Sequence, residues 1–132
     1  MHFDLVDRVL EASPQRIITL KCVTAAEEYL ADHFPTFPVL PGVMMLEAMV
    51  QAARRLAGET GGATPLVLGR VRALKYGRFV RPGESIRVEV DLLKGEGESH
   101  EFKGQVLVAD ASGQATTAAS GRFTLRPALL SG

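Results

Sequence analysis

The chain is short of several features that would point to a particular class of protein. Its single cysteine, Cys22, cannot form an internal disulfide, and its apolar, strand-like surroundings predict a buried, inert thiol. Fifteen basic side chains balance fifteen acidic ones, so no overall field favours nucleic acid or anionic lipid. No stretch reaches the roughly eighteen apolar residues of a membrane-spanning helix. The N-terminus carries two acids and no long apolar run, unlike a signal peptide. We therefore expect a cytoplasmic protein without membrane or nucleic-acid partners.

Several kinds of site are missing as well. Three scattered histidines and one cysteine do not make a metal site. The glycine-rich run at residues 58–62 follows a predicted helix instead of opening one, so it is not a phosphate-binding loop. The sequence has no Gly-x-Ser-x-Gly nucleophile elbow. These absences predict a protein that needs neither metal nor cofactor.

The chain has 132 residues, enough for one domain, which we expect to span residues 1–132. Hydrophobic patterning and turn residues predict two strands, a short helix, one long helix and then four strands. The long helix should end before Gly58, a natural residue to follow a helix C-terminus. The predicted strands are Leu5–Leu10, Arg16–Val23, Leu66–Val80, Ser85–Leu93, Phe102–Ala109 and Ala115–Leu125, and the predicted helices are Ala25–Ala31 and Gly42–Ala57.

This order of elements predicts an α+β fold. The long helix is apolar on nearly all sides, so it should be enclosed by other elements. An antiparallel sheet wrapped around that helix satisfies both the order and the composition. We therefore expect a single hot-dog domain.

Two polar side chains interrupt the first part of the long helix. Glu47 and Gln51 are spaced i and i+4, so they share one stripe. An unpaired carboxylate on an enclosed helix takes up a proton readily, and such a glutamic acid can donate a proton near neutral pH. The alternative is that Glu47 lies at a solvent-facing edge or pairs with Arg54 or Arg55. The helix alone leaves both interpretations open.

A histidine and a helix start lie just upstream. His33 is on a loop stiffened by prolines at positions 35, 38 and 41, and such rigidity suits a catalytic base, although a lone histidine is more often a surface or structural residue. At Gly42 the first N–H groups of the helix lack internal partners and could polarise a thioester carbonyl. An ordinary helix start explains Gly42 equally well.

These residues together resemble the β-hydroxyacyl-[acyl-carrier-protein] dehydratases of the FabZ type. The family pattern is His-Phe-Pro-Gly-x-Pro-x-x-Pro-Gly-Val, three residues, then Glu-Ala-Met-Ala-Gln. The chain differs from the pattern at Thr36, and at Asp32 just before the histidine, where the family usually has glycine. The matching residues are His33, Phe34, Pro35, Pro38, Pro41, Gly42, Val43, Glu47, Ala48, Met49 and Gln51.

The resemblance implies a fold, a reaction and a site. It implies a homodimer of hot-dog domains that dehydrates (3R)-3-hydroxyacyl thioesters to trans-2-enoyl thioesters in fatty-acid or related lipid or polyketide biosynthesis. His33 of one subunit would remove the C2 proton, and Glu47 of the other would help the C3 hydroxyl leave as water. Gly42, Val43, Gln51 and Phe79 would contact the substrate.

The substrate would be carried by acyl-carrier protein or coenzyme A. Carrier proteins are acidic, so a cationic segment is a candidate dock. Two other functions stay open at this point: a hot-dog thioesterase, and a non-catalytic acyl-binding domain. The candidate docking residues are Arg70, Arg72, Lys75, Arg78 and Arg81.

Overall fold

The computed structural model describes residues 5–23, 42–60, 66–81, 83–96, 99–109 and 114–127. The short helix predicted at Ala25–Ala31 lies outside them. No helix in the described part of the chain is both long and apolar enough to cross a membrane. The elements in chain order are β1 (Arg8–Ala12), β2 (Arg16–Cys22), α2 (Gly42–Thr60), β3 (Leu66–Tyr76), β4 (Ser85–Glu96), β5 (Ser99–Ala109) and β6 (Ala115–Pro127).

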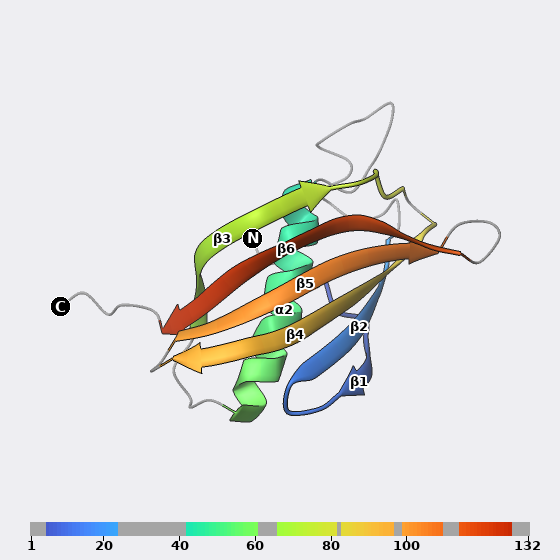
Figure 1. Ribbon diagram of the computed structural model, residues 1–132. Helices are drawn as coiled ribbons and strands as arrows, with labels where there is room; N and C mark the ends of the chain where they lie inside the picture. Colours follow the sequence, from blue (N-terminus) through green and yellow to red (C-terminus); the bar gives the residue numbers. More distant parts are fainter. Residues whose placement is uncertain are drawn as a thin grey trace.

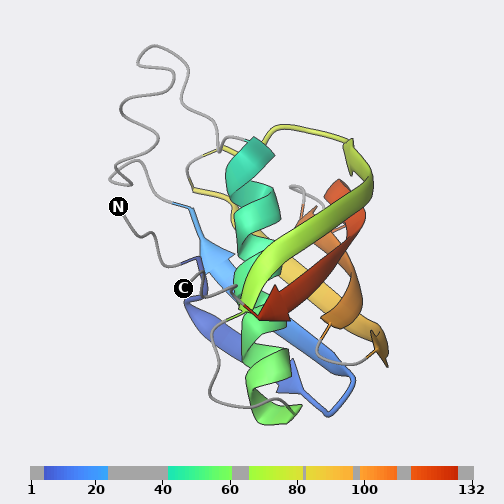
Figure 2. The same cartoon turned by 90° about the vertical axis from the view of Figure 1, so that its left-hand side faces the viewer.

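The six strands form one antiparallel sheet in the order β1-β2-β4-β5-β6-β3. The sheet curves around α2, which crosses its inner face (Figures 1 and 2). This arrangement confirms the predicted hot-dog fold. Because β3 follows the helix but lies at the far edge of the sheet, α2 spans the molecule from β2 to β3.

Side chains in the middle of β4 alternate between the two faces of the sheet. On β4, Ile86, Val88 and Val90 are buried against α2, while Arg87 and Glu89 point to the outer face. The inner face also carries Phe102 and Phe123, whose ring centroids lie 5.6 Å apart. The core between sheet and helix therefore consists of apolar side chains at every second strand position.

Charges on the outer face of β2 and β4 are paired both across and within these strands. Arg16 Nη1 lies 2.7 Å from Asp91 Oδ1, and Arg16 Nη2 lies 3.0 Å from Glu89 Oε1. Arg87 Nε lies 3.0 Å from the same Glu89 carboxylate. The hydrogen bond to Asp91 is the main cause that raises the pKa of Arg16. This part of the predicted wet face is thus a compensated ionic network.

The prediction of a buried thiol at Cys22 is wrong, because the structure exposes it. Alternation along β2 places its neighbour Lys21 on the inner side, where the Lys21 ammonium lies 3.4 Å from Asp7 Oδ1. Cys22 then points outward, with its sulfur 3.5 Å from the hydroxyl of Ser85. Local hydrophobicity misled the prediction because a charged residue, and not the thiol, occupies the inner position.

Several predicted boundaries also differ from the structure, and the first strand runs over Arg8–Ala12 instead of Leu5–Leu10. The long helix does not end before Gly58 but continues to Thr60. A glycine permits a left-handed helix end without imposing one. Strand β3 stops at Tyr76 instead of Val80, and the Gly77 N–H donates to the Ala118 carbonyl 2.8 Å away as the last bond of this pairing.

We expect opposite effects from alanine at two glycines. A Cβ at Gly77 would lie 2.5 Å from the backbone carbonyl oxygen of Thr117, whereas one at Gly58 would meet nothing within 4 Å. Gly77→Ala should lower the free energy of unfolding by about 1–3 kcal/mol through overpacking. Gly58→Ala should raise it by about 0.5–1 kcal/mol because glycine weakens a helix interior. Urea unfolding of both variants against the parent checks this, and equal effects would contradict the close approach of β3 and β6.

Candidate active site

The polar stripe of α2 faces away from the sheet. Residues such as Met45, Ala48, Met49 and Ala52 are buried against the strands, so Glu47 lies on the opposite side of the helix. Its side chain is 37% exposed. The expectation that α2 is enclosed on most sides therefore holds outside this polar stripe, and the candidate acid lies at a partly open surface.

Glu47 is paired within this chain. Its Oε1 accepts a hydrogen bond from Gln51 Nε2 at 3.3 Å, and Arg54 Nη1 lies 3.8 Å from the same oxygen. The structure thus shows the alternative in which Glu47 pairs with a following arginine. Arg54 is held in turn, because its Nε donates to the Leu66 carbonyl at 3.0 Å.

Gln51 connects this stripe to the N-terminal segment. Its Oε1 accepts a hydrogen bond of 2.7 Å from the backbone N–H of Leu5, a fully buried residue 46 positions earlier in the chain. The amide group therefore accepts from the backbone with its oxygen and donates to Glu47 with its nitrogen. These contacts fix the side of the helix on which the carboxylate lies.

Helix α2 begins at Gly42, as predicted, and the ring of Tyr76 lies against that glycine. A Cβ at Gly42 would be 3.0 Å from Tyr76 Cε1. Tyr76 is 50% exposed at the end of β3, and the sequence reasoning missed it. No spacing signal could have found it, because its contact with the helix start depends on the path of the sheet.

The structure describes the remaining predicted site residues to different extents. Phe79 follows β3 and is 66% exposed, so it offers apolar surface near the end of that strand. The backbone of Val43 lies in the first turn of α2, and its side chain is outside the described part of the structure. His33, together with Asp32 and Thr36, also lies outside the described residues, so the pairing of His33 with Glu47 stays a prediction.

The predicted docking segment divides into two groups. Arg70 and Arg72 lie on the first half of β3, and Arg72 Nη2 is 2.6 Å from Glu101 Oε1. Arg78 and Arg81 follow the strand, at the end where Tyr76 meets the helix start. Glu84 binds both of them: its carboxylate lies 2.7 Å from Arg78 Nη2 and accepts the Arg81 backbone N–H at 2.7 Å. Lys75 lies between the groups and is exposed.

The sequence of this chain is similar to those of known dehydratases. The family model of ApeI-like proteins, described as ApeI dehydratase, matches residues 10–122. A 3-hydroxyacyl-[acyl-carrier-protein] dehydratase FabZ from Polaromonas sp. is 42% identical over 113 residues, covering 81% of this chain and 78% of the relative. The chain belongs to the FabZ and ApeI-like dehydratases. It is therefore a dehydratase, as the resemblance of its central motif predicted.

Further matches agree with this assignment. A FabZ enzyme of Caulobacter vibrioides is 38% identical, covering 82% of this chain and 71% of the relative. The solved dehydratase heterocomplex ApeI:P from Xenorhabdus doucetiae superimposes with a TM-score of 0.75 over 96% of this chain and 84% of that chain, at 16% identity. That likeness confirms the hot-dog fold.

The bonds of Gln51 can be tested by substitution. Gln51→Met keeps the approximate shape but leaves the buried Leu5 N–H without this acceptor. We expect it to lower the free energy of unfolding by about 1–3 kcal/mol, the cost of an unsatisfied buried donor. Gln51→Glu should cost less, because a carboxylate oxygen can still accept from Leu5. Chemical denaturation measures both, with Arg55→Met, an exposed position on the same helix, as control. A loss in Gln51→Met no larger than in Arg55→Met would contradict the role of this bond.

Proposed function

We propose that this chain dehydrates 3-hydroxyacyl thioesters at sites shared between two identical subunits, with His33 and Glu47 as the base and acid. Membership of the FabZ and ApeI-like dehydratases supports the reaction. The observation that carries the residue assignment is the placement of Glu47. It lies on the open side of α2, little more than one helical turn from the Gly42 N-terminus, and is held there by Gln51 and Arg54.

The reaction needs a base near C2 of the substrate and an acid near the hydroxyl on C3. His33 takes the C2 proton. The electron pair of the broken C2–H bond moves toward the thioester carbonyl and then forms the C2–C3 double bond. The C3–O bond breaks, and the proton of Glu47 goes to the departing hydroxyl, which leaves as water. The products are the 2-enoyl thioester and water, so no oxidant or reductant takes part.

The start of α2 suits the carbonyl of the substrate. Helix N-termini carry N–H groups without intrahelical partners and a partial positive charge. Negative charge develops on the thioester oxygen during proton removal, and the N–H of Gly42 stabilises it there. Val43 and Gln51 continue this surface along the helix, and Phe79 adds an apolar contact for the acyl chain.

A second subunit would complete the site along β3. This strand is at an edge of the sheet, and its eleven residues make it longer than β1, the five-residue strand at the other edge. Tyr76 at its end contacts the helix start and is half exposed, and Phe79 just beyond is more exposed still. Pairing of two β3 edges about a two-fold axis would cover both aromatic rings and bring the two helix starts near the interface.

Single substitutions should separate catalysis from folding. His33→Ala and Glu47→Ala should each lower dehydration by at least about 10²-fold, the usual value of a general acid or base. Enoyl-thioester formation measures activity, and circular dichroism with sedimentation measures fold and assembly. Arg55→Ala, an exposed change on the same helix, is the control. Turnover by either variant close to that of the parent would exclude its assigned role.

Mixing the two inactive variants tests the shared site. After co-refolding, about half of the dimers should contain one His33→Ala and one Glu47→Ala subunit, and each mixed dimer would have one intact site of two. Activity should then recover to about a quarter of the parent value. Absence of recovery, with mixed dimers confirmed by mass, would show that the two residues pair within one chain.

The carrier should approach the end of the molecule where α2 begins. Arg78 and Arg81 lie at that end, whereas Arg70 and Arg72 lie on the other half of β3. The Arg81 side chain is exposed, so it is a candidate contact for an acidic carrier protein, together with that of Arg78. The use of such a carrier also fits the cytoplasmic location that the sequence predicts.

We expect Arg81→Glu, alone and with Arg78→Glu, to raise KM for the carrier-bound substrate several-fold with little change in kcat. The physical reason is loss of electrostatic steering, so the difference should shrink at high salt. The same acyl group on a short, uncharged thiol should show no such change. Arg8→Glu, an equal charge reversal on β1, is the matched control. Unchanged KM for the carrier substrate would place the dock elsewhere.

A further inference from the structure

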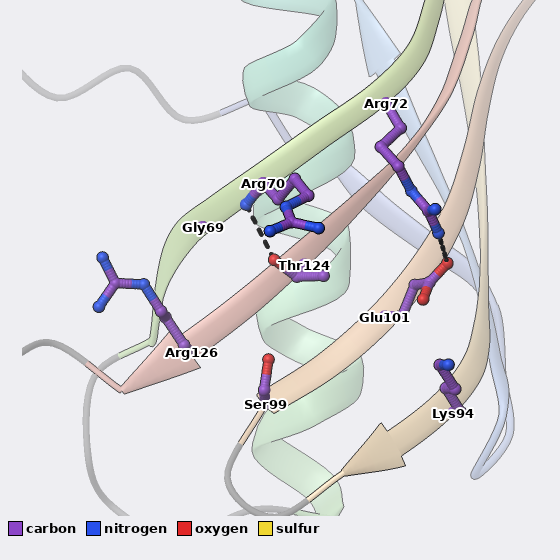
Figure 3. Close-up of a pocket in the computed structure, with 8 residues that line it drawn as sticks. All are labelled: Gly69, Arg70, Arg72, Lys94, Ser99, Glu101, Thr124 and Arg126. Carbon is purple, nitrogen blue, oxygen red and sulfur yellow. Dashed lines mark hydrogen bonds and ion pairs between the residues drawn. The ribbon is translucent and has the colours of Figure 1, made fainter.

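The outer face of the sheet carries an open pocket of about 540 Å³ that the dehydratase site does not use. It lies over the first half of β3 and the neighbouring ends of β6, β5 and β4, with α2 behind the sheet (Figure 3). Arg70 precedes Tyr76 by six residues, or about 20 Å of strand, so the pocket is distant from the helix start. Its lining residues are Gly69, Arg70, Arg72, Lys94, Ser99, Glu101, Thr124 and Arg126.

The pocket depends on a β-bulge in β3. Leu68 pairs with Leu125 and Val71 with Phe123, so Gly69 and Arg70 together lie opposite the single residue Thr124. The Arg70 N–H donates to the Thr124 hydroxyl at 2.8 Å in place of a strand carbonyl. Bulges re-aim side chains, and this one brings Arg70 to the outer face.

Gly69 makes room for the groups that surround the bulge. A Cβ there would lie 2.7 Å from the Thr124 hydroxyl and 3.5 Å from Arg126 Nε. The stem of Arg126 therefore passes over Gly69, and its guanidinium lies on the same side of the sheet as that of Arg70 (Figure 3). Any larger residue at this position would disturb both neighbours.

The charge of the pocket is not balanced within the described part of the chain. Four cationic side chains line it against one carboxylate, Glu101, and that carboxylate is bound to Arg72 at 2.6 Å. Among the described residues, no acidic side chain forms an ion pair with Arg70, Lys94 or Arg126. Three cations are thus left to attract an anion.

The strand register adds like charges directly beside the pocket. Arg72 on β3 pairs with Arg122 on β6, and Arg122 pairs with Lys103 on β5. All three are exposed on the outer face. Like charges directly opposite each other destabilise a sheet, and a bound anion would relieve that repulsion. The chain has no formal net charge, so this concentration of cations is local.

We propose that this pocket binds a phosphate-bearing small molecule, with Arg70 and Arg126 gripping its phosphate and Lys94 adding a further positive charge. Guanidinium groups match phosphate oxygens with paired, charge-assisted hydrogen bonds, and the hydroxyls of Ser99 and Thr124 are suitable donors at the rim. The concave shape and the size of the pocket favour a small phosphorylated ligand over the broad surface of a protein. Free polyphosphate and a nucleotide share this chemistry, so the probes below separate them.

The test is calorimetric titration of the full chain at low salt with inorganic phosphate, pyrophosphate and ADP. We expect saturable binding at one site per chain, tighter for pyrophosphate and ADP than for phosphate. ADP binding more tightly than pyrophosphate would identify a nucleotide as the ligand class, and the reverse would identify free polyphosphate. A rise in the melting temperature on adding the tightest probe should accompany binding, because the ligand binds the folded state.

Matched variants decide whether the pocket is responsible. Arg70→Ser/Arg126→Ser should weaken binding of the tightest probe at least about tenfold, since charge-assisted contacts are lost. Arg8→Ser/Arg55→Ser removes the same charge from exposed positions elsewhere and should leave the affinity unchanged. Equal weakening in both double variants would show diffuse charge attraction and overturn the proposal. Absence of binding by all three probes would also overturn the proposal. If acidic carrier protein bound this face instead, in a salt-sensitive way, the face would be a protein-docking surface.

Discussion

The burial of α2 against the sheet is the constraint on which the other features depend. One long helix covers the inner face of the sheet, and its side chains Met49 and Leu56 are fully buried in the same core as Phe102 and Phe123. Since the apolar side must face the strands, the polar stripe must face away. The position of Glu47 on the open side of the helix is therefore a consequence of core packing. The hydrogen bonds of Gln51 and Arg54 then refine a placement that the hydrophobic effect has already chosen.

Strand β3 joins the two functional ends of the molecule. It has register shifts between Leu68 and Val71 and between Arg72 and Lys75, and Ala73 in the second has a positive φ of 53°. Each shift changes the direction in which the side chains of the following residues point, relative to a regular strand. The first aims Arg70 outward, and the strand beyond the second brings Tyr76 to the helix start. An irregular edge strand thus serves both the phosphate pocket and the dehydratase site, which a flat strand could not do.

The sequence predicted what depends on local pattern and on a specific motif. Period-two alternation predicted the strands, the Met-, Leu- and Ala-rich run predicted the long helix, and the spacing around Glu47 predicted the dehydratase family. It failed where three-dimensional context decides. Cys22 is exposed because Lys21 takes the inner position, and the helix passes through Gly58 because nothing there requires a left-handed residue. The contact of Tyr76 with Gly42 arises between elements 34 positions apart, and no local pattern carries it.

The distribution of charge shows a further division within a chain of zero net charge. On the outer face of β2 and β4, the carboxylates of Glu89 and Asp91 neutralise Arg16 and Arg87. On the outer face of β3 and β6, Arg72 pairs with the Glu101 carboxylate of β5, while Arg122 lies between Arg72 and Lys103 in the register. The cations of β3 and β6 thus outnumber the carboxylates paired with them, whereas those of β2 and β4 are neutralised. This local excess of positive charge favours anions near the β3 edge, where both the proposed carrier contact and the proposed phosphate pocket lie.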